Sequence, residues 1–180
     1  GLNGITVLTR SLKIDELDGT PFIAAKGSNI GVAFTPLLSG KLIVKFVQVD
    51  HPVVYAVKLK PGAWNFEDLL VQTIDVKFIQ ADSGTIHISD RSKTAISKEI
   101  VTLKNVDLKL NWPAKGKSMP FYLSFNTEAE DDQKPGYVRI DGLGKAVDKS
   151  FEHTNYALTV FATNIQAPEI KKILAVVADD

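Results

Sequence analysis

Apolar and polar residues alternate along most of the chain, and β-branched or aromatic residues occupy most of the apolar positions. A period of two is typical of strands, which place successive side chains on opposite faces of a sheet. We therefore predict a mainly β (α+β) fold built on a curved antiparallel sheet, either groove-like or packed as a sandwich. The expected extended segments are 12–17, 22–34, 42–49, 53–59, 74–78, 86–88, 100–110, 121–125, 138–140 and 156–160.

Local signals mark where these segments end or bend. The stretch Asp18-Gly19-Thr20-Pro21 is typical of a turn, and 82–84 (Asp-Ser-Gly) is typical of a hairpin turn. A change of parity at 104–105 (Lys-Asn) predicts a β-bulge. The segment 36–40 (Pro-Leu-Leu-Ser-Gly) predicts a single helical turn or tight loop, closed by a glycine that can take a positive φ.

Two segments break the alternation and predict helices. A short helix is expected near 64–71, because Asn65 is placed to cap it and apolar residues recur at helical spacing from Phe66. A C-terminal amphipathic helix is expected near 168–178, because apolar residues recur at helical spacing from Ile170.

Length and charge limit the classes of partner. With 180 residues the chain has the length of one ordinary domain, 1–180. Lys and Arg number 21 and Asp and Glu number 21, so the formal charge is zero and no overall field favours nucleic acid as a partner. Because the chain begins at Gly1 without a methionine or a signal segment, we expect it to be an excised part of a longer protein.

Motifs that carry chemistry are not found in the sequence. There is no cysteine, and His51, His87 and His153 lie far apart without a second ligand at zinc spacing. His87 is expected to face solvent from the polar side of a strand. The acidic segment 128–132 lacks the spacing of an EF-hand loop, and 142–144 (Gly-Leu-Gly) lacks the third glycine of a nucleotide site. We therefore predict no catalytic residue, no metal and no cofactor, and a protein that is not an enzyme.

A resemblance to a known family rests on segments that occur in a fixed order. They are 12–14, 21–25, 36–42, 47–54 and 62–70, of which Gly62-Ala63-Trp64-Asn65-Phe66-Glu67-Asp68-Leu69-Leu70 is the most specific because it follows a strand that begins at Pro52. Segments 82–90 and 101–108 add to the match. Together they resemble the N-terminal region of the AsmA family of bacterial envelope proteins, which is related to TamB.

The resemblance implies a function in outer-membrane biogenesis. It implies a periplasmic β-rich protein, tethered to the inner membrane by a helix absent from this chain, that binds phospholipid or moves it between membranes along an apolar groove. Other envelope proteins are implied partners. The family supplies no catalytic residues. The expected lipid-facing side chains are Leu42, Val44, Phe46, Phe121, Leu123 and Phe125.

Three alternatives remain open from the sequence. The same alternating side chains fill a closed core if the sheet packs as a sandwich. The second alternative is a scaffold for protein interaction or assembly, in which open strand edges pair with β-structure of a partner. A hydrolase that gathers His, Asp or Glu side chains from distant strands is the weakest reading.

Overall fold

The structure is a computed structural model that describes residues 4–16, 18–41, 43–60, 63–66, 76–92, 98–111, 118–128, 134–146, 154–168 and 170–172. The fold over these ranges is mainly β, which confirms the predicted fold class. One helix with assigned bounds, α1, spans Phe34–Leu38. The strands are β1 (Ile5–Thr9), β2 (Leu12–Asp15), β3 (Pro21–Ala25), β4 (Gly27–Val32), β5 (Val44–Asp50), β6 (Val53–Lys60), β7 (Ala63–Trp64), β8 (Phe78–Asp90), β9 (Lys98–Asn111), β10 (Ser118–Thr127), β11 (Tyr137–Ala146) and β12 (Thr154–Thr163).

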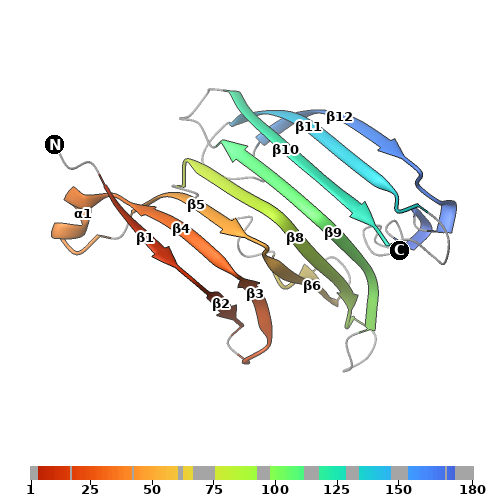
Figure 1. Ribbon diagram of the computed structural model, residues 1–180, viewed down its shortest axis with the longest axis horizontal. Coiled ribbons are helices and arrows are strands. Elements are labelled where there is room, and N and C mark those ends of the chain that lie inside the picture. The colour runs from red at the N-terminus through yellow and green to blue at the C-terminus, as the bar shows by residue number, and fades with distance from the viewer. Residues whose placement is uncertain are drawn as a thin grey trace.

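All of these strands belong to a single open sheet. The longest path through it runs β1-β4-β5-β8-β9-β10-β11-β12, so β1 and β12 lie at opposite edges (Figure 1). Strands β2, β3, β6 and β7 form a branch that joins the same sheet at β8. Figure 1 shows the sheet twisting and curving from β1 to β12 rather than closing on itself.

The branch arises because a long strand is interrupted in its middle and its two halves are counted as separate strands. The pairing register of β4 with β5 continues unchanged into β3 with β6, and that of β5 with β8 continues into β6 with β8. Strands β5 and β6 are therefore two halves of one strand, interrupted at His51 and Pro52. The proline lacks the amide hydrogen that a continuous ladder requires.

The prediction of an antiparallel sheet is wrong at one place. Both β5 and β6 run parallel to β8, whereas the other pairings are antiparallel. Parallel neighbours require a crossover connection rather than a tight hairpin, and the chain between Lys60 and Phe78 supplies its length. Hydrophobic alternation carries no information about strand direction, so the sequence pattern could not reveal this reversal.

A line of bulges crosses the middle of the sheet. The hairpin turn predicted at 82–84 is wrong, because β8 continues through it and Ser83 takes a positive φ of 54° within the strand. The bulge predicted at 104–105 is confirmed by Asn105, with a φ of 50°, and His51 takes a φ of 48° on the other side of β8. Asp107 Oδ1 accepts a hydrogen bond of 2.9 Å from the Ser83 amide, so a side chain satisfies a donor at the bulge.

The helix predictions have mixed outcomes. The helical turn expected over 36–40 is confirmed by α1, and Gly40 follows it with a φ of 75°. The helix expected near 64–71 is wrong at its start, because Trp64 ends β7 and residues 65–66 form a turn. Residues 67–71 lie outside the described ranges.

Asn65 ties this turn to β6. Its Oδ1 accepts a hydrogen bond of 2.9 Å from the Val57 amide, and its Nδ2 donates to the Tyr55 carbonyl at 2.9 Å and to Glu16 Oε1 at 2.7 Å. The side chain was expected to cap a helix, but these contacts serve backbone groups of a neighbouring strand. Of the expected C-terminal helix, residues 167–168 and 170–172 are helical, and residues 173–178 lie outside the described ranges.

Candidate functional site

One face of the sheet carries an uninterrupted row of apolar residues. Residues directly opposite one another in paired strands lie on the same face, so the register can be followed from strand to strand. The row crosses all eight strands of the main path and contains no charged or hydrogen-bonding side chain. Its members are Val7, Ile30, Val47, Ile79, Leu110, Phe121, Gly142 and Leu158.

A second row lies beside the first on the same face. It has hydroxyl groups only at its β1 end and is apolar from β5 to β12; we call the two rows together the apolar face. The members of this row are Thr9, Ser28, Val49, Ala81, Leu108, Leu123, Ile140 and Val160. Phe125, Val138 and Ala162 continue the same face along β10, β11 and β12.

The central row on the opposite face of the sheet is mostly polar. The row between the two apolar rows crosses the same eight strands and carries amide, hydroxyl and charged groups from β4 onward; we call this side the polar face. Its members are Leu8, Asn29, Gln48, Gln80, Lys109, Tyr122, Asp141 and Thr159. Apolar side chains also lie on this face, including Phe46, Leu143 and Phe161, so the chemical contrast with the apolar face holds for the central row.

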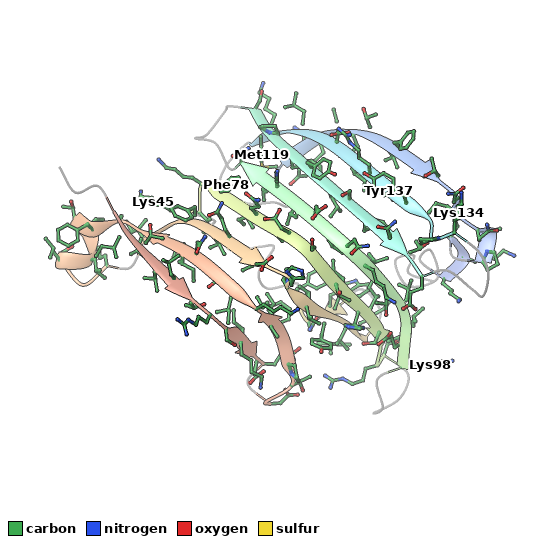
Figure 2. The ribbon with its side chains drawn as sticks, viewed as in Figure 1. Lys45, Phe78, Lys98, Met119, Lys134 and Tyr137 are labelled. Carbon is green, nitrogen blue, oxygen red and sulfur yellow. The ribbon has the colours of Figure 1, made fainter. Side chains whose placement is uncertain are left out.

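Burial on the apolar face decreases from the centre of the sheet to its edges. Leu110 is 6% exposed, whereas Leu158 is 57% and Val160 is 60% exposed. The central side chains form two buried clusters, one around Val101, Leu103 and Val106 and the other around Leu110 and Met119. Figure 2 shows Met119 at the end of the sheet where Phe78 begins β8. The apolar face therefore combines a packed centre with accessible apolar margins.

The six expected lipid-facing residues do not share one surface. Phe121, Leu123 and Phe125 lie together on the apolar face, where they pack against the two buried clusters. Phe46 lies on the polar face, because its neighbour Val47 occupies the apolar row.

Val44 and Leu42 were expected to share a face with Phe46. The register shift after Gly31 pairs Val44 with Val32, so the bulge separates Val44 from Phe46. Leu42 lies outside the described ranges. The list of expected lipid-facing residues left out the apolar residues of β1 and β12, although the segment 156–160 of β12 was expected as a strand.

Two shallow depressions lie among the described residues. The larger, about 400 Å³, is lined by Phe46, Phe78, Gln48, Lys45 and Lys77 at the end of β5 and β8 that Figure 2 labels. The smaller, about 250 Å³, lies where β1, β4, β5 and β8 adjoin and includes Asp50 and Asp82. Over the ranges that the structure describes, no group of three His, Asp or Glu side chains is arranged to hold a metal ion.

His87 belongs to a hydrogen-bonded cluster on the polar face. Its Nδ1 lies 3.1 Å from Glu99 Oε2 and 3.3 Å from Thr102 Oγ1, and Thr102 donates to Glu99 Oε1 at 2.5 Å. The imidazole ring stacks on the ring of Tyr55, with the ring centroids 5.2 Å apart. His87 therefore lies on the polar side of its strand, as expected, and its side chain is 28% exposed while it makes these contacts. A triad would join the hydroxyl and the carboxylate to different ring nitrogens, whereas Nδ1 contacts both here.

Charges on the polar face are compensated locally. Arg139 donates to both carboxylate oxygens of Asp141, at 2.8 and 3.0 Å, and this pairing raises the pKa of Arg139. The guanidinium lies 5.3 Å from the ring centroid of Tyr122. A hydrogen bond with Tyr122 raises the pKa of Tyr137. These pairs leave the polar face without a concentrated charge of one sign in this region.

No family model matches the sequence, and no curated protein matches it. The resemblance to the AsmA family therefore remains an expectation from the sequence. Within the described ranges, none of the helical segments has the length and apolar character needed to cross a membrane.

Proposed function

We propose that this chain is a non-enzymatic lipid-binding module whose apolar face holds acyl chains. The observation that carries the proposal is the row from Val7 to Leu158, which crosses eight strands without a polar side chain. An ordinary open sheet covers such a face with a second layer. Here the margins of the face are accessible at Val7, Leu158 and Val160, where an acyl chain would make contact.

The expected affinity follows from the number of methylene groups that leave water. Each buried methylene contributes about 0.8 kcal/mol. About eight methylenes held against the apolar face would therefore contribute roughly 6 kcal/mol before the entropic cost of association. The apolar face offers no charged partner along its central rows, so the headgroup would lie at a margin of the sheet.

The resemblance to the AsmA family gives this proposal a cellular setting. We place the protein in the bacterial periplasm, tethered to the inner membrane through a segment outside this chain. Its lipid would be a phospholipid destined for, or returning from, the outer membrane. Other envelope proteins would be its partners.

Adjacent positions on β12 allow a matched test. Because the chain has no cysteine, single substitutions Val160→Cys and Phe161→Cys each provide one site for an environment-sensitive fluorophore. Val160 is 60% exposed on the apolar face and Phe161 is 55% exposed on the polar face, so the two labels start from similar solvent contact. A short-chain phospholipid, added below its micellar concentration, should shift the emission of the label at 160 to the blue and leave the label at 161 unchanged.

Equal responses at the two positions would contradict the proposal, because they would indicate non-specific adsorption. The pair Val7→Cys and Leu8→Cys on β1 repeats the comparison at the other edge of the sheet, with Val7 on the apolar and Leu8 on the polar face. No response at 160 and 7 would also contradict it.

An assembly scaffold is the second candidate function. The observation that favours it is the edge strand β12, which pairs with β11 and with no other described strand.

A further inference from the structure

Strand β12 forms an edge of the sheet that no other described strand covers. All ten of its residues pair with β11, and no described strand lies on its other side. Over Thr154–Thr163 the sequence TNYALTVFAT contains no charged residue and no proline. Residues 155–163 are all exposed. Natural sheets normally protect such an edge with charge, proline, a bulge or a very short strand.

The other edges of the sheet carry that protection. Strand β2 bears Lys13 and Asp15, whose side chains pair at 2.9 Å. Strand β7 has only two residues, and β1 has five. Strand β12 is thus the long, uncharged edge among the described strands, which marks it as an interaction surface.

We propose that β12 pairs antiparallel with β12 of a second copy of this chain, about a twofold axis normal to the sheet. A charged edge that pairs with itself brings like charges together, and β12 has none to oppose the pairing. An edge without charge therefore allows a second copy to pair with it in antiparallel register without repulsion. This proposal stands on the strand edge and does not require that the protein binds lipid.

Side chains alternate between the two faces of the sheet, and this alternation restricts which residues of the two copies of β12 can lie opposite each other. Residues directly opposite each other must share a face, and a twofold axis normal to the sheet keeps the apolar faces of both copies on the same side. The axis must therefore pass between the two copies of one residue, which lie directly opposite each other, rather than between two different residues. Leu158 and Thr159 are the central choices in a ten-residue strand. Both choices place Val160 of each copy opposite an apolar side chain, either Tyr156 or Leu158.

The pairing would extend the apolar face across both copies. The rows that end at Leu158 and Val160 would continue into the same rows of the second copy. The apolar margin at β12, which is more than half exposed in one chain, would become the centre of a sheet twice as wide.

Sedimentation velocity over a range of protein concentrations tests the proposal. The unmodified chain should form a dimer. The double variant Ala157→Lys with Thr159→Lys places lysines on the polar face of β12, close to the axis in both registers, and should weaken dimerisation by about tenfold or more. The control Thr6→Lys with Leu8→Lys adds the same charges to the polar face of β1 and should leave the dimer intact.

Circular dichroism of all three proteins checks that the variants fold. A monomer at every concentration for the unmodified chain would overturn the proposal, and so would equal weakening by the two double variants.

Cross-linking tests the geometry separately. In a cysteine-free chain, Thr159→Cys places the two thiols beside the axis, so a short bifunctional thiol reagent should link the copies. Thr6→Cys lies at the opposite edge and should not be linked. Efficient linkage through Thr6→Cys, with none through Thr159→Cys, would show that a different edge is used and would overturn the proposal.

Discussion

Replacement of Gly142 by alanine should destabilise the protein through Phe121. The two residues are directly opposite each other on β11 and β10, and the phenylalanine ring lies over the glycine. An added Cβ would overlap ring atoms Cε1 and Cζ and lie 2.7 Å from Cδ1, so the ring must move. The ring also packs edge-on against Tyr156 with centroids 5.8 Å apart. Movement of the ring would disturb this contact.

The expected magnitude combines three terms. A displaced rotamer costs about 1 kcal/mol. The lost aromatic contact costs about another 1 kcal/mol. The lower backbone entropy of alanine in the unfolded chain offsets about 0.5 kcal/mol of this loss in the free energy of unfolding. We therefore expect Gly142→Ala to lower the free energy of unfolding by about 1–2 kcal/mol.

Urea unfolding of Gly142→Ala beside Gly27→Ala provides the assay. An added Cβ at Gly27 would lie 3.7 Å from the Thr9 carbonyl oxygen, which is an ordinary contact. This control should leave the free energy of unfolding unchanged or raise it by up to about 1 kcal/mol. If Gly142→Ala proves as stable as Gly27→Ala with an equal denaturant slope, the assigned packing of Phe121 on Gly142 is wrong.

Two further predictions concern the turn after β7 and the turn before β3. Asn65→Ala should lower the free energy of unfolding by about 2–3 kcal/mol, because two backbone groups of β6 lose their partner. The side-chain amide of Asn126 makes longer hydrogen bonds, of 3.3 and 3.4 Å, so the control Asn126→Ala should lower the free energy of unfolding by less than half as much in the same denaturation experiment. An equal loss would contradict the role given to Asn65. Hydrogen bonds from Thr20 lower the pKa of Asp18 below its ordinary value of 3.8. The carboxylate therefore stabilises the folded state above pH 3.8, and this contribution is lost as the pH falls through the folded-state pKa. Asp18→Asn should therefore reduce the acid dependence of stability below pH 4, and an unchanged pH profile would refute the assignment.

Strand positions could be predicted from the sequence because alternation and β-branching act locally. The segments expected at 53–59 and 100–110 correspond to β6 and β9, and the parity change inside the latter marks its bulge. The strand β1 was not predicted. Its side chains are mostly exposed, so its place depends on pairing with β4.

Features that depend on distant partners could not be predicted. The turn signal at 82–84 has the composition of a hairpin, yet β5 and β6 hold this segment of β8 in the sheet on one side and β9 holds it on the other. Gly84 fits there because an added Cβ would lie 3.0 Å from Pro52 Cγ and 3.3 Å from the Val106 carbonyl oxygen. A local pattern cannot report such neighbours.

The candidate surface was predicted in part. Alternation correctly grouped Phe121, Leu123 and Phe125 on one face, because β10 keeps a regular register with β11 through them. It wrongly placed Val44 with Phe46, because the bulge after Gly31 is set by the partner strand. The continuity of the apolar face across eight strands arises only when the register of every pair is known.

Native mass spectrometry of the chain purified from bacteria without detergent tests the lipid-binding proposal most directly. We predict that phospholipid remains bound and that Leu123→Asn, which places an amide in the middle of the apolar face, reduces the lipid-bound fraction. Ser124→Asn, its neighbour on the polar face, should retain that fraction once circular dichroism has shown that both variants are folded. A lipid-free protein that also fails to take up added phospholipid would contradict the proposal.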